Sequence, residues 1–210
     1  WNNGVVPADG DDVYANGYTV TLNVDINIGS GKLSNGSDAD LGIAGGGSFA
    51  CKQNSRTIVA NLEHYAFSDL ITQSNNNLVI NGNVSLNDNS SQYWCINKSG
   101  AANGVYGTLN GNVTGNVAGG NLLHLYQQSN GYSETFTING NVFNAKIYMH
   151  SASSNNINYL TINGTTTDVN INNAGKLNYV INDNVNQLNS IINANFDTLY
   201  VSGNNRNETS

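Results

Sequence analysis

Six of the fourteen acidic residues lie within the first forty positions, so this segment is the first in which to look for chemistry. The stretches PADGDDV and SDADLG hold five of them at or near the Asp-x-Asp spacing of calcium loops: Asp9, Asp11, Asp12, Asp38 and Asp40. Neither stretch completes an EF-hand pattern, which needs Gly at position 6 and Glu at position 12. The five aspartates are candidate metal ligands, and turn formation and strand initiation by Asp is the alternative interpretation.

Glu63, His64 and Asp69 form the densest acid–base group in the rest of the chain. A glycosidase needs two carboxylates that flank one sugar bond, about 5 to 9.5 Å apart. No two acids recur at one position of the sequence repeats. The stretch GSGKLSNG also fails the phosphate-loop pattern, because Leu33 follows Lys32. We therefore expect no catalytic residue, no enzyme activity and no cofactor.

Three histidines and one tryptophan occur in similar apolar surroundings: His64, Trp94, His124 and His150. The last three lie at similar distances after Asn-Gly pairs, which suggests one stack of rings along a face of the molecule. Zinc would need three or four converging ligands, so a ring stack on or under the surface is the preferred interpretation. Sugar faces pack on exposed aromatic rings, which makes these residues candidates for glycan binding as well.

The elements that position these side chains follow from the composition. Hydrophobic residues make up 39% of the 210 positions, but charged residues only 10%, well under the ~25% of an ordinary domain. Asn, about a fifth of the chain, and 23 Gly take their place. Val, Ile, Leu, Thr and Tyr come in short runs that Asn and Gly bound, which is the pattern of strands and turns.

The charge distribution and the length of the apolar runs exclude two classes of partner. The net charge is −7, and the seven basic residues are scattered rather than clustered, so no patch can neutralise the phosphates of a nucleic acid. No apolar run approaches the ~20 residues that a membrane-spanning helix needs. We expect neither nucleic acid nor membrane as a partner.

Copies of one motif, two β-formers followed by Asn-Gly, organise the chain. Gly82, Gly111 and Gly140 recur at a constant interval, and matches follow at shorter intervals at Gly164, Asp183 and Gly203. A period of this size indicates stacked supersecondary units, and no segment has the apolar spacing of a helix. The spacing predicts an all-β fold, a single-stranded parallel β-solenoid (β-helix) with coils of about 20–29 residues that tapers toward the C-terminus.

A series of β-hairpins is the competing interpretation, because Asn-Gly between apolar runs is a strong hairpin signal. The solenoid is favoured, since stacked coils require the strands to resemble one another at constant spacing. In a coil, Asn-Gly would mark a corner in the left-handed backbone region. Equivalent Asn side chains would lie ~4.8 Å apart and hydrogen-bond along the stack as a ladder.

Residues 1–55 are expected to form an N-terminal β region, and residues 56–210 the coils of one continuous domain. Residues 18–28 alternate strictly, which predicts a half-buried strand pair or first coil with Val20, Leu22, Val24, Ile26 and Ile28 on one face. Residues 42–50 read as a loop with a tight backbone approach. Cys51 and Cys95 are expected to be buried apolar residues, with a disulfide between them as the alternative.

The stretch WNNGVVPADGDDVYANGYTVTLNVDINIG, residues 1–29, resembles the first coil of β-helical virion proteins of tailed bacteriophages, which include fibre, tail appendage and capsid (head) decoration modules. A Trp, a Val-Pro, Gly-Asp-Asp-Val, Asn-Gly and Thr-Val-Thr-Leu carry the resemblance. It implies a homo-oligomer, preferably a trimer, located in the virion with other virion proteins as partners. Related first coils occur in bacterial surface proteins, so the bacterial cell surface or an extracellular location is the alternative.

Three functions are therefore considered. The leading hypothesis is a structural component of a phage particle that works by rigidity and assembly, because the last coil has no helix to cover its strand edges and such edges invite pairing. The second is a receptor-binding domain, or adhesin, that recognises bacterial surface glycan. The third is a polysaccharide depolymerase.

Overall fold

The structure is a computed structural model, and every regular element in the part of the chain that it describes is a β-strand. This confirms the all-β class. No helix occurs there, and so none that could cross a membrane. The described residues are 5–51, 55–65, 67–73, 77–87, 95–98, 105–116, 121–127, 134–151, 157–167, 169–181, 185–186 and 191–201.

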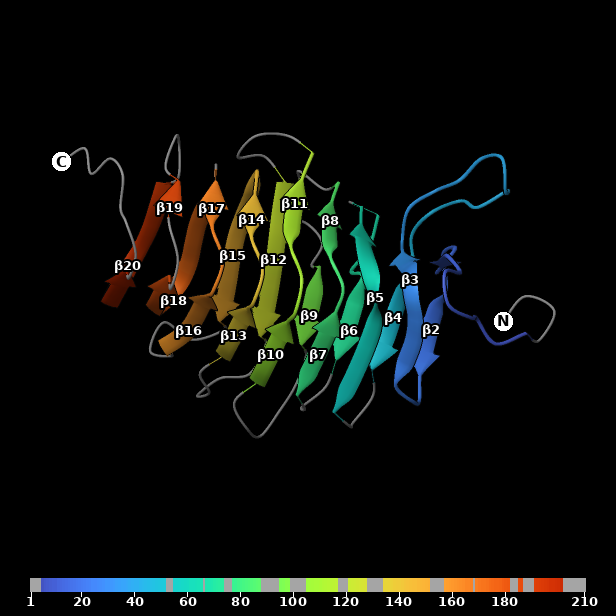
Figure 1. Ribbon diagram of the computed structural model, residues 1–210, viewed down its shortest axis with the longest axis horizontal. Coiled ribbons are helices and arrows are strands. Elements are labelled where there is room, and N and C mark those ends of the chain that lie inside the picture. Colours follow the sequence, from blue (N-terminus) through green and yellow to red (C-terminus); the bar gives the residue numbers. More distant parts are fainter. Residues whose placement is uncertain are drawn as a thin grey trace.

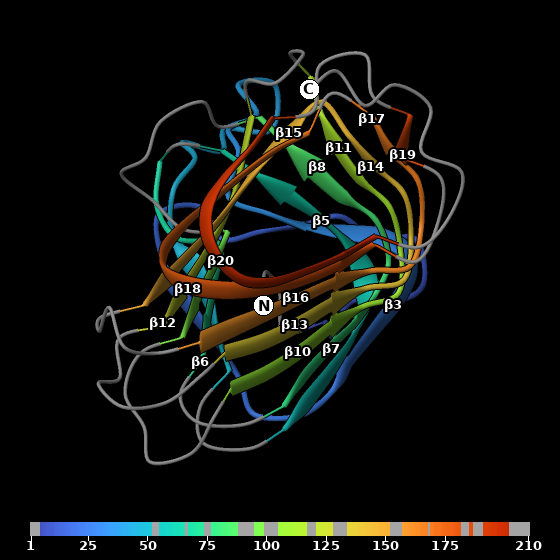
Figure 2. The same cartoon turned by 90° about the vertical axis from the view of Figure 1, so that its left-hand side faces the viewer.

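The strands belong to one 20-stranded sheet that falls into three series, arranged around a common core when viewed along the long axis (Figure 2). Series A contains β7 (Leu78–Asn81), β10 (Val105–Leu109), β13 (Glu134–Ile138) and β16 (Ile157–Ile162). Series B contains β1 (Val13–Tyr14), β8 (Val84–Leu86), β11 (Val113–Gly115), β14 (Val142–Phe143), β17 (Thr166–Thr167) and β19 (Val185–Asn186). Series C contains β2 (Thr19–Leu22), β4 (Ser48–Cys51), β6 (Ile71–Gln73), β9 (Ile96–Lys98), β12 (Asn121–Gln127) and β15 (Ala145–Ser151).

Four long strands connect the series. The strands β3 (Ile26–Ser34) and β5 (Arg56–His64) contribute to series A and B, and β18 (Asn170–Ile181) and β20 (Ile191–Val201) to series C and A. The strands succeed one another along the long axis from the N-terminal to the C-terminal end (Figure 1). Because β3 pairs with β5, the sheet continues across the expected boundary at residue 55.

All strand pairings among the described residues are parallel, and each joins segments that are remote in sequence (Figure 1). The one antiparallel contact in the described part of the chain is an isolated bridge between Asp38 and Ile43. Adjacent strands of a hairpin are antiparallel. The hairpin interpretation is therefore wrong for the described strands.

Apolar side chains form columns, meaning sets of residues that pair in register from strand to strand. The longest column of series A consists of Ile26, Ile58, Ile80, Leu109, Ile138, Ile162, Ile181 and Val201. Its members from Ile58 to Ile162 are buried. β-branched residues suit this position because they pack well on a pleated surface. The core is thus a continuous stack rather than a single central cluster.

The length of chain between column members changes along the stack. Ile80, Leu109 and Ile138 are separated by 29 residues each. The next separations are 24 residues to Ile162, 19 to Ile181 and 20 to Val201. The separations before Ile80 do not follow this decrease, because 32 residues separate Ile26 from Ile58 and 22 separate Ile58 from Ile80.

The glycine of the repeated motif is required for a reason that differs from the expected one. Gly82, Gly111, Gly140 and Gly164 do not have a positive φ, so the left-handed corner is wrong for them. Each instead lies against the backbone of the repeat before it. A Cβ on Gly111, for example, would overlap the carbonyl oxygen of Gly82 and lie 2.5 Å from its carbonyl carbon.

The expected asparagine ladder is confirmed on the residue before this glycine. The Nδ2 of Asn110 donates to Oδ1 of Asn81 at 2.8 Å, Asn139 to Asn110 at 2.7 Å, and Asn163 to Asn139 at 2.6 Å. The residue after the glycine forms a second ladder. There, Oδ1 of Asn83, Asn112 and Asn141 accepts from a backbone N–H of the following repeat at 2.8 to 2.9 Å.

We expect Asn139→Ala to lower the free energy of unfolding by about 1 kcal/mol, because it removes two exposed side-chain hydrogen bonds. Asn81→Ala, at the end of the ladder, removes one such bond and should cost about half as much. Urea denaturation of the two variants checks the ratio. Equal costs would contradict a separate contribution from each bond of the ladder.

The predicted alternation over residues 18–28 is interrupted. Val24 is 66% exposed, so it does not share the buried face of Leu22 and Ile28. The chain turns between β2 and β3, where the buried Arg56 donates from Nε to the carbonyl oxygen of Leu22 at 3.1 Å and from Nη2 to that of Asn23 at 2.8 Å. The segment is two strands joined by a turn.

The loop expected at residues 42–50 is present and ends in β4. Gly47 has a φ of 85°, and a Cβ there would lie 2.6 Å from the backbone nitrogen of Tyr18. Cys51 and Cys95 are buried thiols, which confirms the preferred interpretation.

Candidate functional site

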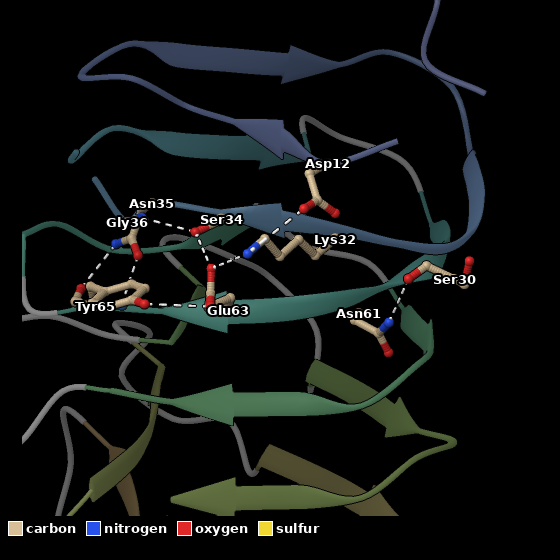
Figure 3. A network of polar contacts seen from close by, with 9 residues as sticks. All are labelled: Asp12, Ser30, Lys32, Ser34, Asn35, Gly36, Asn61, Glu63 and Tyr65. Carbon is tan, nitrogen blue, oxygen red and sulfur yellow. Dashed lines mark hydrogen bonds and ion pairs between the residues drawn. The ribbon is translucent and has the colours of Figure 1, made fainter. Parts of the chain in front are cut away.

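A polar network joins β3 to β5 near the N-terminal end of the stack (Figure 3). Register places Lys32 and Ser34 of β3 beside Asn61 and Glu63 of β5. The Glu63 carboxylate lies 3.0 Å from Lys32 Nζ, accepts from Ser34 Oγ at 2.8 Å and accepts from the Tyr65 hydroxyl at 3.4 Å. Three donors therefore converge on one carboxylate. Asp12 lies 3.8 Å from the same ammonium group.

The electrostatics of the network favour protonated Lys32 and Tyr65. Burial by itself would lower the pKa of Lys32, but its hydrogen bonds with Glu63 and Tyr14 and the negative charge of Glu63 outweigh burial and raise that pKa above 10.5. The Lys32 ammonium also lies 5.4 Å from the centre of the Tyr14 ring, in the range of a cation–π contact. Burial and then the charge of Glu63 raise the pKa of Tyr65 above its ordinary 10.0.

A pH dependence follows from the Lys32 pKa. Because the folded state binds this proton more tightly than the unfolded state, Lys32 contributes its full stabilisation below about pH 10 and loses it as the pH rises through the folded-state pKa. The difference in free energy of unfolding between wild type and Lys32→Met should therefore be constant from about pH 7 to 9 and shrink above about 10.5. Urea midpoints across this range check it. A difference that grows with pH would contradict the assigned contact.

Asn35 has a structural role that the sequence did not indicate. Its side chain is buried, donates to the carbonyl oxygens of Tyr65 at 3.0 Å and Ser68 at 2.8 Å, and accepts from the Tyr65 N–H at 2.7 Å. Its backbone oxygen accepts from Gly46 at 2.7 Å. One residue thus ties the loop of residues 36–47 to the loop after β5.

Two neighbouring grooves at the N-terminal end share lining residues in and around β1. The first, of about 680 Å³, is lined by residues 5–7, 11–16, 18, 20 and 21. The second, of about 740 Å³, is lined by residues 12, 14, 16, 38, 41 and 43. They share Asp12, Tyr14 and Asn16. Their walls are formed by the first strands of the stack and by the loop that Asn35 holds.

Three of the five aspartates proposed as metal ligands accept hydrogen bonds from backbone N–H groups. Asp9 accepts from Ser30 at 3.2 Å, Asp11 from Ala8 at 2.7 Å, and Asp38 from Asp40 and Leu41, both at 3.1 Å. The contacts of Asp11 and Asp38 join residues two or three positions apart and are the turn contacts of the alternative interpretation, whereas Asp9 contacts a residue 21 positions away. No group of three or more His, Cys, Asp or Glu residues within the described ranges is placed to hold a metal ion.

The four ring residues do not share one column as far as they are described. His64 is buried, with Nε2 3.3 Å from the Ser68 carbonyl oxygen, so it does not present its ring to a ligand. In the pairing of β12 with β15, His124 lies opposite Tyr148, and His150 lies opposite Tyr126. The two histidines are thus out of register with each other. Trp94 falls outside the described residues.

The acid–base group of Glu63, His64 and Asp69 is not assembled as a hydrolytic pair. Neighbouring residues of β5 face opposite sides of the sheet, so Glu63 points outward and His64 into the core. The Glu63 carboxylate is already neutralised by Lys32. These contacts of Glu63 hold β3 and β5 together.

Comparisons of this chain with protein-family models, with curated proteins and with solved structures find no match.

Proposed function

We propose that the chain forms a parallel β-solenoid and works as a rigid structural module of a tailed-phage particle, as a fibre, tail appendage or capsid decoration. The observation that carries the proposal is one continuous column of parallel-paired residues, which runs from Ile26 to Val201. Repeats that contact only their neighbours build a quasi-one-dimensional body. Such a body suits a spacer or support.

The bonding between repeats favours rigidity. Each repeat meets the next through backbone hydrogen bonds, an apolar column, and side-chain ladders on both sides of the close-packed glycine. Bending the stack would open all three at once. The resemblance of residues 1–29 to the first coil of phage virion proteins supplies the proposed location and the expected trimer.

Analytical ultracentrifugation tests the proposal in solution. We expect a particle of three times the 22.3 kDa chain mass, with a sedimentation rate lower than that of a sphere of that mass. The oligomer should persist at nanomolar concentration, because virion components assemble through large interfaces. A compact monomer would contradict the proposed role.

Glycan binding is a second candidate, and one observation favours it. Tyr159 is 39% exposed on series A, and Tyr106 lies in the same column two repeats earlier. Exposed aromatic rings suit sugar faces. A glycan array separates the candidates: binding that is lost in Tyr159→Ala would support a receptor-binding domain.

Polysaccharide cleavage remains the third hypothesis, and we expect no turnover. Glu63 is the acid best placed for it, yet its carboxylate contacts Lys32 and Ser34. Incubation of capsular polysaccharides with wild type and Glu63→Gln checks this. Turnover in wild type that the variant lacks would establish an enzyme.

A further inference from the structure

The N-terminal end of the stack exposes the ends of three apolar columns. Val13, Val20 and Ile26 are the first members of their columns and pair with buried residues, respectively Leu33, Phe49 and Ile58. The three end members are only partly buried, although they pack against the core. Among the described residues, nothing continues these columns beyond them.

The strand edge at this end is also open. Among the described strands, β2 pairs only with β4 and β1 only with β3. In a parallel ladder, alternate backbone groups point to opposite sides. The outward groups of β2 therefore face away from the stack, and an open edge of this kind is a template for another strand.

Apolar side chains surround the open edge. Val5, Val6 and Tyr18 are 68%, 71% and 72% exposed and line the first groove, and Leu41, 68% exposed, lines the second. Exposed apolar residues that gather in one place mark an interaction site more often than scattered ones do. The edge and the grooves thus form one surface.

The charge of this surface identifies what would bind it. Asp11, Asp12 and Asp38 line the grooves, and none of the lining residues is Lys, Arg or His. The cation nearest to them, Lys32, lies closer to Glu63, at 3.0 Å, than to Asp12, at 3.8 Å. A ligand of complementary charge carries Lys or Arg.

We propose that this end binds an extended strand of a partner protein that carries apolar residues at alternate positions and Lys or Arg beside them. The strand adds parallel to β2. Its apolar side chains stack on the partly buried Val20, as Phe49 does on the other side, and its cations face the three aspartates. The inference rests on the proposed solenoid and names the chemistry of its assembly partner.

A second copy of this chain fits the surface less well. The chain carries a net charge of −7. Its last described strands, β19 and β20, contain Asp197 and no Lys or Arg, so they offer no cation to Asp11, Asp12 and Asp38. Charge complementarity therefore favours a different polypeptide.

The test uses a short peptide, acetylated and amidated, with Val at alternate positions and Lys at both ends. Titrated into the ¹⁵N-labelled protein, it should shift the amide signals of residues 18–22 and leave those of residues 139–142 unchanged. The double variant Asp11→Asn/Asp38→Asn keeps the side-chain oxygens that accept backbone hydrogen bonds and should weaken binding about tenfold. Asp25→Asn, which removes a charge that lies outside both grooves, is the matched control and should bind as wild type does.

Three results would overturn the proposal. The first is no shift at residues 18–22, and the second is equal binding of a peptide with Glu in place of Lys. The third is a shift of the same signals when the protein alone is concentrated, which would assign the surface to a second copy. Because sedimentation is measured without peptide, failure of this inference is distinguishable from failure of the structural role.

Discussion

Gly111→Ala is expected to lower the free energy of unfolding by about 3 kcal/mol or more, or to prevent folding. The added methyl group would overlap the Gly82 carbonyl oxygen, and neighbouring repeats hold the backbone on each side of this contact. Relief would require the two repeats to separate, which would break the asparagine ladders that flank the glycine. Thermal and urea denaturation measure the loss.

Gly42→Ala is the matched control. Gly42 has a φ of 69°, but no atom lies within 4 Å of the position of its Cβ. The substitution should cost only the strain of the left-handed conformation, about 1 kcal/mol. If Gly111→Ala were no worse than Gly42→Ala, the close stacking of repeats at the glycine column would be contradicted.

Asn35→Ala should cost about 3 kcal/mol, the second largest effect, because it leaves the N–H and carbonyl of Tyr65 and the carbonyl of Ser68 without the partner that Asn35 supplies. A buried polar group that loses its partner costs about 1–3 kcal/mol. Urea denaturation measures the loss. Amide hydrogen exchange should also accelerate in residues 36–47, because Asn35 anchors that loop.

Two further substitutions separate hydrogen bonding from volume. Asn35→Asp keeps the acceptor for the Tyr65 N–H but faces two carbonyl oxygens with a carboxylate, so it should be at least as destabilising as Ala. Asn116→Ala removes an exposed bond to Asn87 and should cost less than about 1 kcal/mol. A mild effect of Asn35→Asp would show that the side chain fills space rather than bonds.

The repeat and its asparagine ladder were predictable, because both follow from recurrence of the motif. Equivalent residues stack only if the spacing between copies matches the pairing of strands, and the pairs Val79 with Thr108 and Thr108 with Thr137 show that it does. The matches at Asp183 and Gly203 fall outside the described residues. The prediction for the glycine was wrong. A sequence shows that the residue has no side chain, but it does not show which neighbouring atoms leave no room for one.

Residues whose roles depend on distant partners were not predictable. Asn35-Gly36 has the same Asn-Gly sequence as the repeated motif, yet the Asn35 side chain is buried and hydrogen-bonds to residues about thirty positions away. Arg56 was counted only as one of several scattered charges, but it holds the turn that exposes Val24. His124 and His150 are out of register for a related reason, because distance from the motif does not fix register once the chain turns into another series of strands.

Spin-label distances along one column test the central claim most directly. Ser85, Thr114, Phe143 and Thr167 pair in register on series B, so Ser85 and Thr167 are three strand spacings apart although they are remote in sequence. With ~4.8 Å per spacing, cysteine-linked labels at these two sites, with Cys51 and Cys95 replaced by Ala, should lie on the order of 15 Å apart by pulsed electron paramagnetic resonance. A stacked parallel fold predicts this short distance. A separation at least twice as long would contradict it.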